Sequence, residues 1–498
     1  MLYTSTRNNN IKVTAAQAIA QGISEEGGLF VPCELPEFSL NKIGEMVSLS
    51  YIDRAKVVLR EFLTDFSEEE LDYCVCGAYA KDKFSSEKIA PVVNVNKNEN
   101  ILELWHGPTC AFKDMALQLL PYLMTVSAKK TADGKTIVIL VATSGDTGKA
   151  ALEGFKDVDN TKILVFYPVD GVSPMQKLQM TTQEGENVAV CAINGNFDDA
   201  QSSVKAIFTN DDIKAQLAKK NMMFSSANSI NWGRLVPQIV YYFSAYADLI
   251  EQGRINLGDE INVVVPTGNF GNILAGYYAK MMGLPIKKLV CASNSNNILT
   301  DFLKTGDYDK NREFYTTTSP SMDILISSNL ERLLYHMSGE DDTLVTSLMK
   351  SLSDGGKYTV SPELISNIQT MFEAGFCDEN SVNDTIKNHF DSYKYLCDTH
   401  TSVALKVYEN YVAETGDDIP TVIDSTASPY KFSKSVLGAV IGKSVSDLDE
   451  FETVDELNRV TGAEVPAPLK ALKNKSVRFS DVCDKENMSE MVFKLLSL

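Results

Sequence analysis

A single lysine, Lys113, stands in a mostly apolar stretch that reads ELWHGPTCAFKDMALQLLP. From Cys110 onward, apolar side chains would cover nearly every side of a helix. Such a helix is buried, so we expect Lys113 to be buried in the protein interior. Burial disfavours the charged ammonium and lowers the pKa of a lysine, and the free amine can then condense with a carbonyl. The stretch therefore predicts a Schiff-base lysine. A surface lysine that pairs with Asp114, or that extends its head group into solvent, is the alternative.

A glycine-rich segment, TGNFGN, directly follows the β-branched run Ile261–Val265 and precedes a helical pattern. Backbone N–H donors that converge at a helix N-terminus can bind a phosphate group, and the helix dipole adds to the attraction. Gly268 and Gly271 would let the backbone approach such a ligand closely. The segment predicts a phosphate site, with a plain strand-to-helix turn as the alternative. The candidate ligands are Gly268, Asn269, Phe270, Gly271 and Asn272.

A second segment, TSGDTG from Thr143 to Gly148, follows another β-branched run in the same way. Its hydroxyl and N–H donors suit a carboxylate. The phosphate loop of kinases is a competing interpretation, and it fails on two positions. Thr143 stands where that loop has its first glycine, and Ala150 follows Lys149 where a magnesium-binding Ser or Thr is required.

Four segments, taken in order, resemble the threonine synthase family of fold-type II pyridoxal-phosphate enzymes. They are HGPTCAFKDMALQLL, ATSGDTGKAA, SINWGRLVPQIVYYF and PTGNFGNILAGYYAK. The stretches YTSTRN and EEGGLFVP also resemble the N-terminal region of that family, so the likeness covers most of the chain. Each motif alone is weak, whereas their ordered combination is specific. The resemblance implies an α/β fold similar to tryptophan synthase β, with two parallel or mixed sheet domains, flanking helices and an N-terminal domain.

The resemblance also implies roles for the candidate residues. Lys113 would carry pyridoxal 5′-phosphate, and the segment from Gly268 to Asn272 would bind its phosphate. Similar enzymes place a hydroxyl against the pyridine nitrogen, where we expect Thr426, with Ser425 as the second candidate. The substrate carboxylate is expected at Ser144, Gly145 and Thr147.

Two stretches in the C-terminal part of the chain are expected to lie at the rim of the site. Ser428-Pro429-Tyr430 stands where the family has a His-Pro pair, so the chain departs from the family pattern there. The stretch DTHTSVAL also resembles the family, and its His400 is either a residue that lines the site or a structural histidine.

Threonine synthase, a carbon–oxygen lyase acting on phosphates, converts O-phospho-L-homoserine and water into L-threonine and phosphate in the last step of threonine biosynthesis. The resemblance implies this activity and a second anion site for the substrate phosphate. Arginine gives a bidentate fork for phosphate, although ordinary salt bridges are the alternative. A serine or threonine dehydratase and a non-catalytic cofactor binder are the alternative functions. The candidate phosphate ligands are Asn231, Arg234 and Arg332.

These candidates must be positioned by an alternation of short β-branched runs and helical patterns that begins near Asn100. Such an alternation predicts parallel sheets, whose ligands lie beyond the C-terminal ends of the strands. We expect an N-terminal domain (1–95), a large cofactor-binding domain (96–135 and 235–498) and a small domain (136–234). The clearest expected strands are Thr136–Val141, Lys162–Phe166, Asn187–Ile193, Ile261–Val265, Lys288–Ala292 and Thr421–Ile423.

Composition narrows the kinds of partner. The 498 residues carry a formal net charge of −20 without a basic stripe, which disfavours nucleic acid and anionic membranes. The longest aliphatic run, Ile137–Ala142, is too short for a membrane span, and the N-terminus lacks an apolar signal core. Nine cysteines without framework spacing fit a reducing cytoplasm, and four histidines make a metal site unexpected. We expect a small-molecule substrate and a monomer or homodimer.

Overall fold

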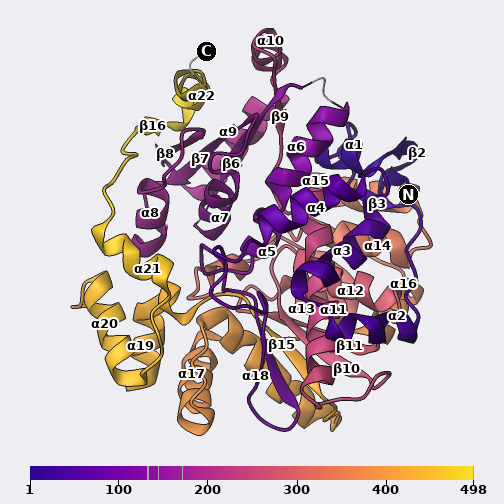
Figure 1. Cartoon of the computed structure of the whole chain (residues 1–498), viewed down its shortest axis with the longest axis vertical. Helices are drawn as coiled ribbons and strands as arrows, with labels where there is room; N and C mark the ends of the chain where they lie inside the picture. Colours follow the sequence, from indigo (N-terminus) through magenta and orange to yellow (C-terminus); the bar gives the residue numbers. More distant parts are fainter. Residues whose placement is uncertain (132–133, 144, 171, 497–498) are drawn as a thin grey trace.

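The structure, a computed structural model, describes residues 1–131, 134–143, 145–170 and 172–496 (Figure 1). Two mainly parallel sheets with helices packed against them hold the candidate site, and a three-stranded sheet lies at the N-terminus. In the described part of the chain, the small sheets are formed by β1 Tyr3–Ser5, β2 Asn8–Val13 and β3 Phe30–Pro32, and by β12 Asp307–Asp309 with β13 Lys357–Thr359.

The larger sheet has six strands in the order β14-β11-β10-β15-β5-β4. All neighbouring strands in it are parallel except β4 and β5. The central strand β10 is buried at every position and is apolar except for Asn262, as is usual for a strand covered on both faces. Its strands are β4 Val92–Asn94, β5 Glu99–Glu103, β10 Ile261–Pro266, β11 Ile286–Ser293, β14 Phe372–Phe376 and β15 Thr421–Ser425.

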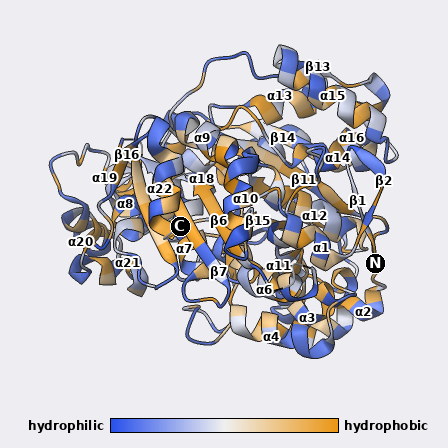
Figure 2. Ribbon diagram, turned by 90° about the horizontal axis from the view of Figure 1, so that it is seen from above, coloured by the Kyte–Doolittle hydropathy of each residue, from blue (hydrophilic) through white to orange (hydrophobic). Residues whose placement is uncertain are grey.

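The second sheet has five strands, all parallel, in the order β16-β8-β7-β6-β9. Figure 2 shows the hydrophobic colour concentrated on strands of both sheets, such as β6 and β11. The six strands expected from the sequence are all present; five are one to three residues longer than expected, and β8 is shifted by one residue. The strands of this five-stranded sheet are β6 Thr136–Ala142, β7 Thr161–Pro168, β8 Val188–Asn194, β9 Met222–Ser225 and β16 Val482–Asp484.

Helices enclose both sheets. The long helix α11, Trp232–Glu251, is buried along almost its whole length and packs against the N-terminal helices and α12. The helices that precede it are α1 Ala15–Gln21, α2 Leu40–Glu45, α3 Tyr51–Phe62, α4 Glu68–Ala78, α5 Asp114–Leu117, α6 Leu120–Thr131, α7 Asp146–Phe155, α8 Pro174–Thr181, α9 Phe197–Thr209 and α10 Asp211–Lys219. Those that follow are α12 Gly271–Met281, α13 Ile298–Thr305, α14 Leu330–Met337, α15 Asp342–Gly355, α16 Pro362–Met371, α17 Glu379–Tyr393, α18 Thr399–Thr415, α19 Ser433–Ile441, α20 Glu450–Thr461, α21 Ala467–Ala471 and α22 Met488–Leu496.

The expected domain division needs one correction at each end of the large domain. The C-terminal strand β16 pairs with β8, so the tail, which we expected in the large domain, completes the five-stranded sheet of the small domain. Strand β4 lies within the expected N-terminal domain but pairs with β5 of the six-stranded sheet. Both strands are only three residues long, which leaves too little periodicity for the sequence to reveal their partners.

The helix expected from Cys110 through Leu120 is interrupted. Cys110 has a φ of 59°, in the left-handed region, and α5 spans only Asp114–Leu117 before α6 begins at Leu120. Pro121 has no N–H to continue the hydrogen-bond ladder of a single helix, which favours a new helix starting there. Lys113 is therefore the residue before a short helix rather than a member of a long apolar one.

Candidate active site

Lys113 is buried in the turn before α5, with 9% of its surface exposed. Its Nζ donates a hydrogen bond to Ser321 Oγ at 3.1 Å and lies 3.8 Å from Asp146 Oδ2. Burial lowers the pKa of Lys113 to about 8; the carboxylate of Asp146 opposes this shift, and the cations Lys431 and Arg234 add to it. Such a lysine supplies free amine near neutral pH, the form that attacks a carbonyl.

This pKa has a consequence for stability. Lys113 titrates at about 8 in the folded chain and near 10.4 when unfolded, so between these values the unfolded state binds more protons and the stability of the parent rises with pH. Lys113→Met should therefore raise the free energy of unfolding of the cofactor-free protein by about 3 kcal/mol at pH 7. The advantage should fade by pH 10. Denaturant unfolding at several pH values measures it, and a difference that does not change with pH contradicts the burial argument.

The backbone around Lys113 is held by the segment that follows β15. The Phe112 N–H donates to the Thr426 carbonyl oxygen at 2.8 Å, and the Ser428 N–H donates to the Cys110 carbonyl oxygen at 3.0 Å. These two hydrogen bonds hold the segment from Cys110 to Phe112 against the segment from Thr426 to Ser428. They bring Thr426 beside the lysine although more than 300 residues separate the two in the sequence.

The two hydroxyl candidates for the pyridine nitrogen differ in their partners. Ser425 Oγ accepts hydrogen bonds from Trp105 Nε1 and from Thr401 Oγ1, both at 3.0 Å. Among the described residues, nothing binds the hydroxyl of Thr426, which is 5% exposed. Thr426 is thus the better placed of the two for a ligand contact, and this assignment stays a proposal.

The segment from Gly268 to Ile273 forms a cradle of backbone N–H groups. Its carbonyl groups are held from outside, because Ser327 Oγ donates to Gly268 O at 2.7 Å and Asn329 Nδ2 donates to Asn269 O at 2.9 Å. No backbone N–H of the cradle donates a hydrogen bond to any described residue. Helix α12 starts within it, so converging donors and a helix dipole fit a phosphate group.

Two of the expected cofactor ligands direct their side chains away from the cradle. Asn272 Oδ1 accepts from the Tyr242 hydroxyl at 2.6 Å, and Asn272 Nδ2 donates to Asp424 Oδ2 at 2.9 Å. Phe270 has a φ of 62°, and its ring is buried against Phe372. Both residues can therefore offer an anion only their backbone N–H groups.

The TSGDTG segment joins β6 to α7, and Ser144 lies outside the described residues. Gly145 has a φ of 144°, a conformation that L side chains rarely adopt. Its N–H donates to Thr143 Oγ1 at 3.0 Å, so it shapes the turn and is not free for a substrate carboxylate. The Thr147 N–H has no acceptor among the described residues, and its predicted substrate contact stays a proposal.

The structure corrects the expected role of Asn231. Its Oδ1 accepts from the Gly233 N–H at 2.8 Å, and its Nδ2 donates to the carbonyl oxygens of Ile19 at 3.0 Å and Ser226 at 2.9 Å. Asn231 is the fully buried N-cap of α11, and its side chain has little capacity left for a substrate.

Arg332 is also committed to the fold. Its Nε donates to Phe30 O at 2.9 Å, its Nη2 to Ile230 O at 2.7 Å and its Nη1 to Asn329 Oδ1. The side chain thereby joins the N-terminal sheet to the residue that holds the cradle. A fully buried guanidinium engaged on all its nitrogens is poorly placed for a substrate phosphate, which corrects the expected role of Arg332.

Arg234 is the buried cation with spare donors. Its Nη1 donates to Ala227 O at 2.6 Å, whereas its buried Nε has no partner among the described residues. No carboxylate lies within 4 Å of this guanidinium in that part of the chain. Burial lowers the pKa of Arg234 to about 10, so it stays charged at neutral pH. An unpaired buried charge of this kind indicates an anionic ligand.

Sequence reasoning missed Lys431, which is fully buried within the short 3-10 turn Pro429–Phe432. Its Nζ lies 2.6 Å from Asp146 Oδ1 and donates to Thr109 O at 3.0 Å. Burial alone would raise the pKa of Asp146, but Lys431 and Lys113 hold it well below its usual range. A lysine between two aromatic residues, in the segment that follows the expected strand Thr421–Ile423, was the signal that could have pointed to it.

His400 contacts Ser321, the residue whose hydroxyl accepts a hydrogen bond from Lys113. Its ring packs on Phe432, its Nδ1 is 2.7 Å from Asp398 Oδ2, and its Nε2 accepts the Ser321 N–H at 3.2 Å. The carboxylate fixes the tautomer that leaves Nε2 as an acceptor. His400 thus orients Ser321, whose hydroxyl receives the hydrogen bond from Lys113.

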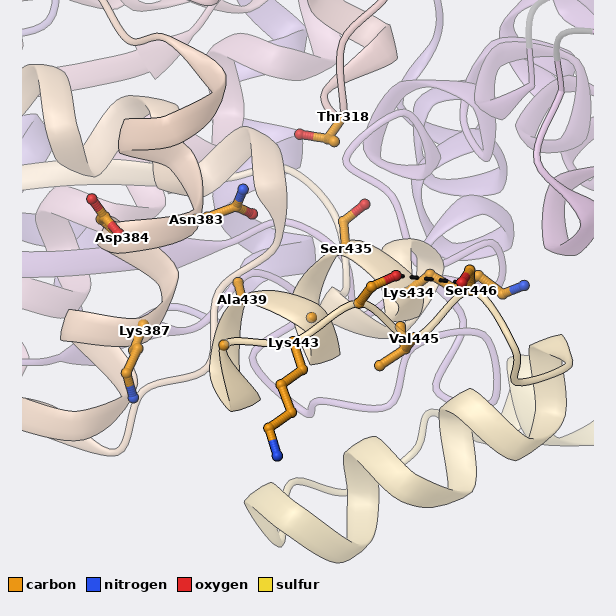
Figure 3. A pocket seen from close by; sticks show the side chains of 13 residues that line it. Thr318, Asn383, Asp384, Lys387, Lys434, Ser435, Ala439, Lys443, Val445 and Ser446 are labelled. Atoms are coloured by element: carbon orange, nitrogen blue, oxygen red, sulfur yellow. Dashed lines mark hydrogen bonds between the residues drawn. The ribbon is translucent and has the colours of Figure 1, made fainter.

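A cavity of about 610 Å³ opens elsewhere, between α17, α19 and the loop that follows α19 (Figure 3). Lys387, Lys434 and Lys443 contribute to its wall, and the close-up shows these lysines on different segments. Lys113 does not line it. Among the residues that line it, Thr318 is the one nearest in sequence to Ser321.

The buried lysine, the cradle at the C-terminal end of β10 and the two-sheet fold define a fold-type II pyridoxal-phosphate-dependent enzyme. A family model described as pyridoxal-phosphate dependent enzyme matches residues 96–363. Models described as threonine synthase N terminus and threonine synthase, C-terminal match residues 2–79 and 401–492. The chain belongs to the threonine synthase family.

Individual relatives agree with this assignment. Threonine synthase from Pseudomonas aeruginosa is 38% identical over 89% of this chain and 91% of its own. A crystal structure of pyridoxal-phosphate-bound threonine synthase from Brucella melitensis superposes with a TM-score of 0.88 at 37% identity, covering 99% of each chain. The human protein threonine synthase-like 1 is 40% identical over 87% of this chain, which spans 58% of that protein's length.

The cofactor of the family fits the residues present. The unused N–H groups of the cradle suit its phosphate, and Lys113 is a buried lysine with a lowered pKa. Within the described residues, no helix is long and apolar enough to cross a membrane, and no cluster of His, Cys, Asp or Glu could hold a metal ion. All nine cysteines are free.

Proposed function

We propose that the protein is a threonine synthase that converts O-phospho-L-homoserine and water into L-threonine and phosphate. The observation that carries the proposal is that two arrangements for anions accompany Lys113: the cradle, whose Gly268 lies against Ser321, and the partly unpartnered guanidinium of Arg234, whose charge lowers the pKa of Lys113. A phosphorylated cofactor accounts for one arrangement. A substrate that carries its own phosphate accounts for the other.

Pyridoxal phosphate, when bound, supplies an electron sink that stabilises carbanions of the substrate. Lys113 takes the proton from the substrate Cα and moves protons at the neighbouring carbons, while the bond from Cγ to phosphate breaks and water adds at Cβ. Ser321 Oγ and Asp146 hold the ammonium form of Lys113 between transfers. Thr426 offers its hydroxyl to the pyridine nitrogen, and Arg234 binds the phosphate of the substrate.

The test is the product of the purified, cofactor-loaded protein. With O-phospho-L-homoserine we expect phosphate and threonine in equal amounts, and no product from unphosphorylated homoserine. Formation of 2-oxo acids from L-serine or L-threonine, without turnover of phosphohomoserine, would identify a dehydratase. Cofactor retention without turnover of any of these amino acids would leave a binding protein instead.

The cradle gives a separate prediction about cofactor retention. A Cβ on Gly271 would meet nothing closer than Asn329 Nδ2 at 3.4 Å, so the fold tolerates a side chain there. Gly271→Val should still lose affinity for pyridoxal phosphate, by about tenfold or more, because the side chain enters the space where the phosphate approaches the backbone.

Fluorescence titration with pyridoxal phosphate measures this loss. Gly442→Val is a matched control outside the cradle, at the end of α19, where a new Cβ has open space, although its φ of 67° adds some strain. Equal cofactor affinity in the parent and the Gly271 variant would place the cofactor phosphate elsewhere.

A further inference from the structure

The ion pair between Lys431 and Asp146 joins the two sheet domains at the site. Asp146 is the first residue of α7, which follows β6 of the five-stranded sheet. Lys431 lies in the turn after β15 of the six-stranded sheet. Both side chains are almost fully buried, at 4% and 0% exposed, so the contact is not screened by solvent.

The buried charges around this pair do not balance. Lys113, Lys431 and Arg234 bring positive charge to the site, and the carboxylate of Asp146 is the anion within 4 Å of Lys113 and Lys431. The neighbouring carboxyl of Asp114 has both oxygens engaged by Thr109, at 2.8 and 2.7 Å. A cluster of buried cations with so little compensation favours the entry of a multiply charged anion.

Lys431 is able to exchange partners. An ammonium has three donors, and only Asp146 and Thr109 O accept from this one among the described residues. Asp146 would keep partners after the exchange, since Gln176 Nε2 donates to its Oδ1 at 3.0 Å and Lys113 lies 3.8 Å from its Oδ2. Loss of Lys431 to a ligand would therefore not strand a bare carboxylate.

We propose that Lys431 is a second ligand for the phosphate of the substrate and that Asp146 is the internal anion which this phosphate displaces. The inference rests on the proposed function for the identity of the substrate, and it goes further by assigning the specificity for a phosphate group to an exchange of partners. The displaced carboxylate of Asp146 then faces Lys113. It stabilises the ammonium form of Lys113 after the lysine has taken a proton.

The exchange predicts opposite changes in phosphate affinity when Asp146 and when Lys431 is replaced. The probe is inorganic phosphate bound to the cofactor-loaded protein, measured by titration calorimetry, so that the cradle is already filled. Asp146→Asn removes the competing anion and should tighten phosphate binding about threefold or more. Lys431→Met combined with Asp146→Asn leaves no unpaired charge from the pair, which protects the fold, and should weaken phosphate binding at least tenfold relative to Asp146→Asn alone.

A matched control is Lys156→Met, which removes one lysine from an exposed pair with Glu184 in the same domain. It should leave phosphate affinity unchanged. Weaker phosphate binding by Asp146→Asn, or equal affinity in the single and the double variant, overturns the proposal. The calorimetric result is independent of turnover, so a parent protein that does not convert phosphohomoserine refutes the proposed function without deciding the role of Lys431.

Discussion

Lys113→Met is expected to lower the turnover of phosphohomoserine by at least about 10³-fold, because the proposed function makes this one residue both the point of cofactor attachment and the base that moves protons. This loss of turnover is larger than the loss expected from removing a single hydrogen bond. Lys113 is the lysine beside Thr426, and its pKa of about 8 makes its amine available at neutral pH. Steady-state phosphate release measures the loss.

Attachment can be located independently of activity. Borohydride reduction of the cofactor-loaded parent, followed by peptide mapping, should label Lys113. Lys149 and Lys431 are internal comparisons, since both are buried but each is held by a carboxylate, Glu153 at 2.8 Å and Asp146 at 2.6 Å. A label on either of these lysines would refute the assignment, and the activity of Lys113→Met would then need another explanation.

Arg234→Ala is expected to lower kcat/KM for phosphohomoserine by about 30-fold to several thousand-fold, which corresponds to about 2 to 5 kcal/mol for a buried, charge-assisted contact. The effect should fall mainly on KM. The variant should still retain the bound cofactor, because Arg234 is not part of the cradle.

Arg332→Ala provides the comparison, since it removes the same buried group at a position where every nitrogen already has a partner. It should lower the free energy of unfolding by about 3 kcal/mol or more, by leaving carbonyl groups unpaired. Thermal unfolding and kinetics of both variants separate the two roles. A stable Arg332 variant with a raised KM, together with an unaffected Arg234 variant, would reverse our assignment of the two arginines.

Much of the fold could be predicted because the decisive signals are local. Strands β6 and β10 are rich in Val and Ile, the pattern of parallel strands buried on both faces. The cradle was predictable for the same reason, since glycines after a strand and before a helix imply free backbone donors. The burial of Lys113 was predicted from its apolar neighbours, although the local pattern overestimated the length of its helix.

The rest of the site depends on contacts between distant residues. Ser321 meets Lys113 across 208 positions of the sequence, and nothing local to Ser321 announces that contact. Asn231 illustrates the opposite error, since its place in a family-like motif suggested a ligand while the preference of asparagine for helix N-caps pointed to the role observed. For Arg234 and Arg332 the sequence shows only two cations, and burial together with partner atoms distinguishes them.

The pairing of β16 with β8 has a consequence for the order in which the protein can be completed during synthesis. Cys191 and Cys483, on these neighbouring strands, are 292 positions apart, so β8 has left the ribosome long before its partner is made. Until then its outer backbone groups form an open sheet edge, which can recruit other chains. The nascent protein therefore passes through a long aggregation-sensitive interval, which the arrival of β16 and α22 brings to an end.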